Sequence, residues 1–185
     1  MRIISGKFKG KRISAPSGER VRPTQDRVKE TSFNILYSKN AVAGARVLDL
    51  FAGTGNLGIE ALSNGAEACV FVDIDKESLK FIKQNLANVG IDPRESYTVS
   101  VYHNDYKSAI KKCDGRFDLI FVDPPYNFKN FDELVDLIAE YGILSAGGVV
   151  MIEHDSKVII NADKNLFNVD IRKLGNTTLT FLERI

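Results

Sequence analysis

The sequence contains few of the residues that stabilise disulfide-rich or metal-dependent proteins. Its 185 residues include only two cysteines and two histidines. Cys69 and Cys113 lie far apart and form no Cys-x-x-Cys pair, so the sequence fits neither a disulfide framework nor a zinc site. His103 and His154 share no local spacing with other ligand types. We therefore expect no bound metal, and a fold that depends on a hydrophobic core.

Long hydrophobic runs and a secretion signal are also missing. The longest apolar runs, residues 119–122 and 148–152, fall well short of the roughly 20 residues that span a bilayer. The first seven residues, MRIISGK, contain no apolar segment with a small-residue cleavage site. The composition, 44% hydrophobic and 26% charged, is typical of a folded domain rather than a disordered chain. These features predict a soluble cytoplasmic protein.

Charge is nearly balanced overall but is unevenly distributed. The formal net charge is +1, yet residues 1–30 contain nine Lys and Arg against three Asp and Glu. This first segment therefore carries +6, and the remainder carries −5. Such an asymmetry suggests a basic segment, suited to a polyanionic partner, attached to a mildly acidic domain. The alternative is a solvated N-terminus of ordinary lysines.

Short apolar strands alternate with amphipathic helices after residue 46, which predicts a doubly wound, Rossmann-like α/β sheet with helices on both faces. The expected strands are residues 47–51, 68–72, 98–102, 117–122 and 149–153, and the expected helices are residues 57–63, 76–89, 107–112 and 132–141. Residues 166–173 and 177–183 flank Gly175-Asn176, so the mostly parallel sheet should end in an antiparallel hairpin.

The basic N-terminal segment has its own pattern. Residues 2–14 place apolar side chains around Gly6 and Gly10, which predicts a short twisted hairpin. Residues 24–37 predict a helix, with Thr24 as the N-cap and Asp26 in the first turn. The apolar face of this helix is formed by Val28, Ile35 and Leu36.

A glycine-rich segment between the first expected strand and helix is the most informative local motif. Gly53, Gly55 and Gly58 form a G-x-G-x-x-G pattern, and Asp73 follows at the end of the next strand. This context is typical of a site for an adenosine-containing ligand, with the acid bonded to ribose hydroxyls. The alternative is that the glycines only shape the turn.

The ligand class is a separate question, because NAD and S-adenosylmethionine both present an adenosine at such an edge. Asp49 lies four residues before Gly53. Its charge would repel a pyrophosphate but would favour a ligand that carries an ammonium group. Asp49 could instead be a structural cap for the loop.

Asp105 follows the third expected strand and is placed to accept a hydrogen bond from an adenine amino group, with Ile74 and Tyr106 on either side of the ring. The alternative for Asp105 is a helix N-cap. The expected cofactor contacts are Asp49, Phe51, Ala52, Gly53, Thr54, Gly55, Asp73, Ile74, Asp105 and Tyr106.

The tetrapeptide Asp123-Pro124-Pro125-Tyr126 ends the strand predicted at residues 117–122. Two prolines hold a stiff, extended corner and donate no backbone hydrogen bonds. The Asp123 carboxylate and the Pro124 carbonyl then form two adjacent acceptors, suited to a planar NH2 group. Tyr126 can stack on the attached ring. The alternative is a rigid turn with a capping aspartate and a buried tyrosine.

Together, the glycine loop, Asp73, Asp105 and the Asp123-Pro124-Pro125-Tyr126 tetrapeptide resemble those of class I S-adenosylmethionine-dependent methyltransferases that act on a base amino group. Residues 22–34, RPTQDRVKETSFN, resemble the segment characteristic of the bacterial 16S ribosomal RNA guanine-N2 methyltransferases. The resemblance covers nearly the whole chain. Asn56 stands at a position where small residues are often expected.

The resemblance implies S-adenosylmethionine as cofactor, S-adenosylhomocysteine as product, and Asp123, Pro124, Pro125 and Tyr126 as catalytic residues. It implies an RNA-binding extension at residues 1–40 and a methyltransferase domain at residues 41–185. RNA contacts are expected from Lys7, Lys9, Lys11, Arg12, Arg22, Thr24 and Arg27. For Arg22, Thr24 and Arg27 the alternative is a role as a helix brace. The partner would be 16S rRNA, within a small-subunit assembly intermediate, and the protein a monomer.

Three other functions are compatible with part of the sequence. An NAD-dependent oxidoreductase would use the same glycines and Asp73, but no second domain follows and the tetrapeptide has no role in hydride transfer. A non-catalytic RNA-binding module would not need the acceptor residues. An amino methyltransferase of another nucleic acid or of a protein would share the motifs, although the chain is too small for a separate DNA-recognition domain.

Overall fold

The computed structural model describes residues 1–16, 23–94, 96, 98–113 and 115–185. The helices are α1 (Pro23–Ser38), α2 (Asn56–Ser63), α3 (Lys76–Asn88), α4 (Tyr106–Lys112) and α5 (Phe131–Glu140). The strands are β1 (Arg46–Asp49), β2 (Ala68–Asp73), β3 (Val99–His103), β4 (Phe117–Val122), β5 (Leu144–Asp155), β6 (Phe167–Leu174) and β7 (Thr177–Arg184).

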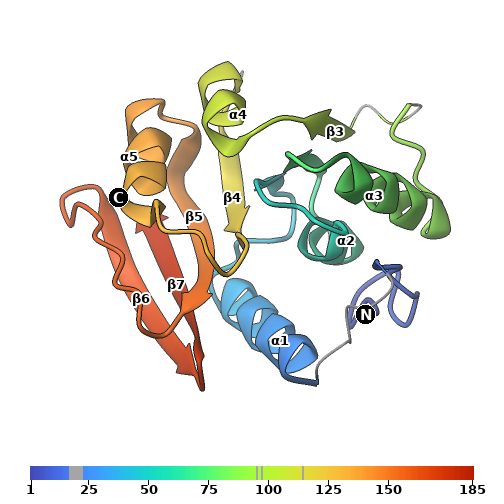
Figure 1. Cartoon of the computed structure of the whole chain (residues 1–185), viewed down its shortest axis with the longest axis horizontal. Coiled ribbons are helices and arrows are strands. Elements are labelled where there is room, and N and C mark those ends of the chain that lie inside the picture. Colours follow the sequence, from blue (N-terminus) through green and yellow to red (C-terminus); the bar gives the residue numbers. More distant parts are fainter. Residues whose placement is uncertain (17–22, 95, 97, 114) are drawn as a thin grey trace.

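The strands form one mixed sheet in the order β3-β2-β1-β4-β5-β7-β6 (Figure 1). Pairing is parallel from β3 to β5, while β7 pairs antiparallel with both β5 and β6. The order reverses between β1 and β4, which is where open α/β sheets bind their ligands. The predicted α/β architecture, with its terminal antiparallel hairpin, is confirmed.

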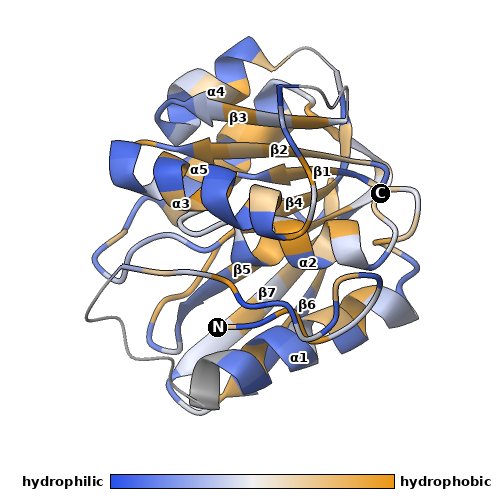
Figure 2. Cartoon of the chain, turned by 90° about the vertical axis from the view of Figure 1, so that its right-hand side faces the viewer, coloured by the Kyte–Doolittle hydropathy of each residue, from blue (hydrophilic) through white to orange (hydrophobic). Residues whose placement is uncertain are grey.

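Two hydrophobic clusters lie on opposite faces of the sheet. One cluster contains residues of α1, α2, α3 and the N-terminal segment, and the other contains residues of α4 and α5. Figure 1 shows α2 and α3 to the right of β4, α5 to its left and α4 above it. Figure 2 shows the apolar strands between helices whose outer surfaces are hydrophilic. None of the helices in the described part of the chain is long and apolar enough to cross a membrane.

The N-terminal segment packs against the rest of the molecule. Ile3, Phe8 and Ile13 are buried in the same cluster as Phe33 of α1 and Ile82 of α3. Residues on both sides of the boundary predicted at 40/41 therefore share one core. Their division into an RNA-binding extension and a catalytic domain stays a prediction.

The structure corrects three local predictions. The predicted hairpin of residues 2–14 is reduced to a single antiparallel bridge between Arg2 and Arg12, because turns occupy most of the intervening residues. The first helix begins at Pro23, so Thr24 lies in its first turn rather than at the N-cap. Strand β5 begins at Leu144, five residues before the predicted start, because its pairing with β4 continues across a register shift between Phe117 and Leu119.

Candidate active site

Acidic side chains gather at the carboxyl edge of the parallel strands. Three neighbouring strands, β2, β1 and β4, end at or just before an acid, in the spatial order Asp73, Asp49 and Asp123, and Glu153 lies two residues before the end of β5. Asp105 follows β3 at the edge of this row. Because parallel strands present their carboxyl ends on one side, a single surface collects these carboxylates.

The glycine loop between β1 and α2 requires its glycines for two different reasons. Gly53 and Gly55 have positive φ values of 53° and 78°, a conformation that side chains disfavour. Gly58 lies against β2, where a Cβ atom would come within 2.3 Å of the Phe71 ring. The loop therefore turns tightly at Gly53 and Gly55, while Gly58 lets the start of α2 pack closely on the sheet.

A cavity of about 290 Å³ lies beside this loop. Of the predicted cofactor-binding residues, the structure brings together Asp49, Phe51, Ala52, Gly53 and Thr54 in its lining, and Asp123 closes one side. Gly55 is buried behind them. Among the described residues that line the cavity, Lys29 is the one basic side chain.

Asp49 is the acid of this cavity that is fully buried and keeps one oxygen without a partner among the described residues. Its side chain is 1% exposed, and Oδ2 accepts a hydrogen bond from the Gly58 amide at 3.1 Å. Oδ1 is buried without a hydrogen-bond partner among the described residues. Burial raises the pKa of Asp49 to about 8, and the charges of Asp123 and Asp73 raise it further. The loop-capping alternative thus accounts for one oxygen and leaves the other available to a positively charged ligand.

Asp73 and Asp105 both contact backbone amides. Asp73 accepts from Gly53 N at 2.7 Å and from Asp75 N at 2.8 Å, so it ties the glycine loop to the end of β2. Asp105 is the N-cap of α4 and accepts from Ser108 N at 2.9 Å, as the alternative reading of this residue expected. The backbone bond to Ser108 holds the pKa of Asp105 below its usual value. Contacts of either acid with a nucleoside stay a prediction.

The two expected ring-stacking residues differ in their surroundings. Ile74 is 69% exposed beyond the end of β2. Tyr106 packs against Phe51 and Phe128, with ring centroids 5.5 Å apart in each case. Phe128 continues this aromatic cluster to Phe131. Ile74 is thus free to cover a ligand, whereas Tyr106 belongs to a packed aromatic wall.

A second cavity, of about 680 Å³, adjoins the first. The whole predicted catalytic tetrapeptide lines it, together with Phe128, His154 and the turn between β6 and β7. Tyr126 is 88% exposed, and its hydroxyl donates a hydrogen bond to Asp155 Oδ2 at 2.6 Å. The tyrosine is therefore held at the rim of the cavity, and the alternative of a buried Tyr126 is wrong.

Asp123 and Glu153 are the acids that line both cavities in the described part of the chain. Burial raises the pKa of both carboxyl groups, and the charge of Asp123 raises that of Glu153 further. No group of three or more His, Cys, Asp or Glu side chains within the described ranges is arranged to hold a metal ion. Asp123 and Glu153 therefore present carboxylates to both cavities, and each cavity can bind a cation or a hydrogen-bond donor.

Sequence reasoning missed Glu153 and Lys29. Glu153 is the last residue of the strand predicted at residues 149–153, the same kind of position that drew attention to Asp49 and Asp73, although β5 itself continues to Asp155. Lys29 lies within the segment 22–34 but looked like one more surface lysine of a basic region. The structure instead buries it, with a 3% exposed side chain between α1 and α2.

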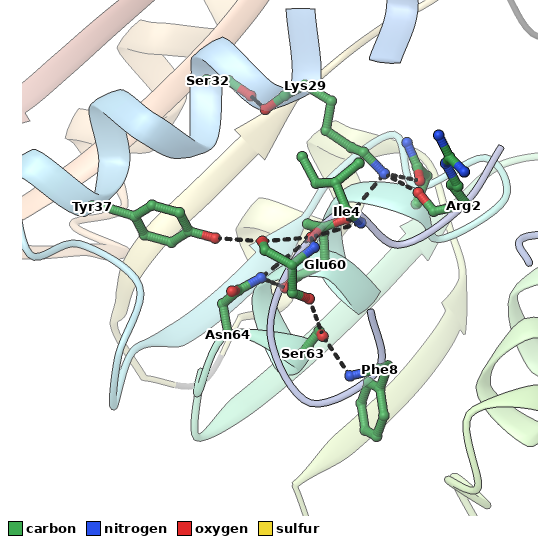
Figure 3. Close-up of polar contacts among 11 residues, drawn as sticks. Arg2, Ile4, Phe8, Lys29, Ser32, Tyr37, Glu60, Ser63 and Asn64 are labelled. Carbon is green, nitrogen blue, oxygen red and sulfur yellow. Dashed lines mark hydrogen bonds and ion pairs between the residues drawn. The ribbon is translucent and has the colours of Figure 1, made fainter. Parts of the chain in front are cut away.

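Lys29 belongs to a polar junction that attaches the N-terminal segment to the domain (Figure 3). Its Nζ lies 3.0 Å from Glu60 Oε2, and it donates hydrogen bonds to the Arg2 carbonyl and to Asn56 Oδ1. Glu60 also accepts from the Ile4 amide at 2.9 Å. The junction therefore connects the N-terminal segment, α1 and the glycine-loop end of α2.

The predicted RNA-contacting residues are mostly exposed. Lys7, Lys9, Lys11, Arg12 and Arg27 have exposed side chains. Arg22 lies outside the described residues, and for Thr24 only its place in α1 is described. The exposed cations Lys7 and Lys11 flank the Phe8 ring, 5.6 Å and 6.0 Å from its centroid. The basic surface is thus carried by a segment with a buried apolar anchor.

Comparison with known proteins gives consistent matches. The profile of a family described as conserved hypothetical protein 95 matches residues 1–183. The Bacillus subtilis protein YlbH, provisionally named an rRNA methyltransferase, is 42% identical over 161 residues, which are 85% of this chain and 84% of that protein. The Haemophilus influenzae protein named ribosomal RNA small subunit methyltransferase D is 32% identical over 83% of this chain and 78% of its own length. An Escherichia coli structure, yhhF, titled provisionally as a methyltransferase, has a TM-score of 0.84 at 27% identity and covers 100% of this chain and 97% of its own.

Proposed function

We propose a function from the premise that this chain belongs to the family described as conserved hypothetical protein 95: it is an S-adenosylmethionine-dependent methyltransferase of small-subunit ribosomal RNA. Relatives named as small-subunit rRNA methyltransferases support this proposal. The observation that carries it is the pair of adjoining cavities. One is formed by the glycine loop and the other by the tetrapeptide, and Asp123 lines both.

S-adenosylmethionine is the cofactor, and the chemistry of the first cavity suits its amino-acid end, whereas Asp73, Ile74 and Asp105 lie outside the lining of that cavity. The unpartnered Asp49 Oδ1 would hold its ammonium group, since a buried carboxylate oxygen without a donor favours a cation. Asp73 would accept from the ribose, and Asp105 with Ile74 would contact the adenine. When bound, the cofactor supplies a methyl group on a positively charged sulfur.

We propose the exocyclic N2 amino group of a guanine as the target. Asp123 and the Pro124 carbonyl would accept its two hydrogens, and the aromatic ring of Tyr126 would stack on the base. The lone pair of such an amino group is delocalised into the ring. Acceptors that strengthen as positive charge develops on nitrogen favour its pyramidal form and hence the transition state.

The RNA would be bound by the basic face of residues 1–40. A guanine amino group can enter the second cavity only when the base is unpaired or extruded. Lys7, Lys9, Lys11, Arg12 and Arg27 are exposed and can contact phosphates. We propose that the protein acts as a monomer, on 16S rRNA in an assembly intermediate of the small subunit, and therefore in the cytoplasm.

The deciding experiment measures methyl transfer from labelled S-adenosylmethionine to small-subunit particles and free 16S rRNA from cells that lack this protein. Loss of one N2-methylguanine in those cells, and its restoration in vitro, are the expected results. Methylation at another atom or base would refute the guanine-N2 assignment. Binding of NAD in preference to S-adenosylhomocysteine, measured by calorimetry, would refute the methyltransferase.

Asp123→Ala tests the catalytic assignment in the same assay. We expect kcat to fall about 1000-fold, because an acceptor aimed at the developing charge is lost. Binding of S-adenosylhomocysteine should change little. Asp170→Ala, at an exposed strand on the far edge of the sheet, is the matched control. Retained activity in Asp123→Ala would remove this residue from the mechanism.

Replacement of Lys7, Lys9, Lys11 and Arg12 by glutamine tests the RNA-binding surface. We expect weaker RNA binding and a shallower dependence of affinity on salt, because fewer counterions are released. Cofactor affinity should stay unchanged. An RNA affinity equal to that of the wild type would mean that these side chains are solvated bystanders.

A further inference from the structure

Tyr126 is attached to the protein at both ends of its side chain. Its backbone follows Asp123-Pro124-Pro125, a stiff corner directly after β4. Its hydroxyl donates a hydrogen bond of 2.6 Å to Asp155 Oδ2, on the last residue of β5. The side chain is nevertheless 88% exposed, so most of the ring surface is open to a ligand. A ring that is fixed at its two ends and open on its faces is suited to stacking on a base.

The hydrogen bond has the length of a charge-assisted contact. Bonds from a hydroxyl to an ionised carboxylate measure about 2.5–2.7 Å and are stronger than bonds between neutral groups. The bond to Tyr126 holds the pKa of Asp155 below its usual value, and the same bond raises the pKa of Tyr126. Lys157 and His154 also favour the ionised form of Asp155. At neutral pH the carboxylate is therefore ionised, and the tyrosine keeps the proton that forms the bond.

Asp155 is itself held by the sheet and by a turn. It pairs with Thr177 of β7, and its Oδ1 accepts from the Lys157 amide at 2.8 Å. The next residue, Ser156, donates from its amide to the Asn176 carbonyl at 2.9 Å, in the turn between β6 and β7. The carboxylate is therefore supported by the antiparallel end of the sheet, whose strands lie outside the cofactor cavity.

Building on the proposed function, we propose that Asp155 is a positioning residue that orients the Tyr126 ring, so that an extruded guanine stacks with its amino group at Asp123. Asp155, Tyr126 and Asp123 line the second cavity together. Neither Asp155 nor Tyr126 is among the described residues that line the first cavity. Asp155 therefore acts on the target base rather than on the cofactor. A ring that is already oriented loses little conformational freedom when the base arrives.

The proposal predicts which kinetic constant changes. Phosphate contacts supply most of the affinity for RNA, whereas extrusion of a base is unfavourable. The orientation of Tyr126 therefore changes the fraction of bound RNA whose target base occupies the second cavity, and not the amount of RNA that is bound. Loss of the Asp155 carboxylate should reduce kcat and leave the KM for RNA nearly unchanged.

A double-mutant cycle of Asp155→Ala and Tyr126→Phe tests this role in the methyl-transfer assay. Each variant removes the hydrogen bond, and Tyr126→Phe keeps the ring. We expect kcat to fall about 10-fold in each single variant and no further in the double variant. The KM for RNA and the Kd for S-adenosylhomocysteine should stay within about 3-fold. Tyr141→Phe, just before the start of β5 and so at the opposite edge of the sheet, is the matched control and should behave as the wild type.

The cycle also separates positioning from a structural role of the turn. If Asp155→Ala lowers kcat equally with Tyr126 and with Phe at position 126, Asp155 acts through its bond to Lys157, and the inference is overturned. An unchanged kcat in Asp155→Ala would overturn it as well. An increased kcat would show that the hydrogen bond holds the ring away from the base, which is the opposite of the proposed role.

Carbon-13 relaxation of the tyrosine rings at neutral pH, measured on the cofactor-free protein, separates this inference from the proposed function. The Tyr126 signal is assigned by its absence in Tyr126→Phe. We expect the order parameter of this ring to fall in Asp155→Ala, because the side chain is then attached at one end only. A ring that stays equally ordered would overturn the inference. A wild type that methylates no rRNA would instead refute the proposed function, while the relaxation data still decide whether Asp155 orients Tyr126.

Discussion

Two buried carboxylates, Asp49 at the end of β1 and Glu60 within α2, have different surroundings. Glu60 is 0% exposed and accepts from the Ile4 and Ser5 amides, while Lys29 neutralises its charge. Asp49 is 1% exposed and has one donor, the Gly58 amide, with one oxygen unpartnered. The two carboxylates are therefore buried to the same extent, but Glu60 has several hydrogen-bond and ion-pair partners whereas Asp49 has one.

This difference in partners indicates the role of each carboxylate. A buried charge with a full set of partners holds the fold together, and its removal leaves those partners unsatisfied. A buried carboxylate with an unused oxygen at the wall of a cavity destabilises the empty protein and favours a bound cation. We therefore assign Glu60 to the attachment of the N-terminal segment, and Asp49 to ligand binding.

The largest expected effect is that of Glu60→Ala on stability. We expect the free energy of unfolding to fall by about 3–5 kcal/mol, because Lys29 is left buried without its counter-charge. Thermal denaturation should show this as a fall in Tm. Hydrogen exchange at the Ile4 and Ser5 amides should accelerate most. The double variant Lys29→Met with Glu60→Leu should recover much of the loss, because it leaves no unpaired charge.

A loss of less than about 1 kcal/mol in Glu60→Ala would contradict the comparison. So would a loss of equal size in Asp49→Asn. Either result would mean that the number of hydrogen-bond partners of a buried carboxylate does not distinguish a structural role from a ligand-binding role.

Gly6→Ala should have the next largest effect and tests the same attachment without a change of charge. Gly6 has a φ of 75°, and an added Cβ would lie 2.0 Å from the Ser63 carbonyl oxygen on α2. We expect a loss of about 2–3 kcal/mol in unfolding free energy. Gly10→Ala is the matched control, since its φ of 84° imposes similar strain but a Cβ would meet nothing within 4 Å. Equal losses in the two variants would show that backbone strain, rather than close packing on Ser63, limits this position.

Asp49→Asn should reduce ligand binding but not stability. We expect the Kd for S-adenosylmethionine to rise about 10-fold to 30-fold, because one charge-assisted contact is lost. The Tm of the empty protein should stay unchanged or increase, since a buried ionisable group with an unpartnered oxygen is replaced by a neutral amide. Calorimetry and thermal denaturation check the two parts. A fall in Tm with unchanged Kd would reverse the assignment and make Asp49 the structural group.

Most of the fold could be predicted because the strands are short apolar runs bounded by turn-forming residues. The β6–β7 hairpin around Gly175-Asn176 was located in this way. The start of β5 was missed because Ser145-Ala146-Gly147-Gly148 has the composition of a turn. Its pairing with β4 continues across a register shift between Phe117 and Leu119, a tertiary feature that no local pattern reveals.

The residues of the candidate site also fall into those that a local motif reveals and those that depend on tertiary contacts. Asp49, Gly53 and Asp123 belong to local motifs, so sequence reasoning could select them. Glu60 and Lys29 acquire their roles only through a contact between α1 and α2. Glu153 lines the site because β5 pairs in parallel with β4, which ends just before Asp123. Residues that act through tertiary neighbours therefore had no distinctive pattern in the sequence.

The pH dependence of ligand affinity is the smallest expected effect and the sharpest test of the comparison. Because burial raises the pKa of Asp49 to about 8, the empty site holds a protonated Asp49 at neutral pH. A positively charged ligand favours the ionised form, so binding should release a proton and affinity should increase from pH 6.5 to pH 8, by about 5-fold. Above that range the increase should level off.

Calorimetry in two buffers of different ionisation enthalpy measures the protons released. The number of protons released should decrease in Asp49→Asn. It should be unchanged in the double variant Lys29→Met with Glu60→Leu, because Lys29 and Glu60 already neutralise each other in the empty protein. Proton uptake by the wild type would show that Asp49 is ionised before the ligand arrives, and the contrast between the two carboxylates would then lose its electrostatic basis.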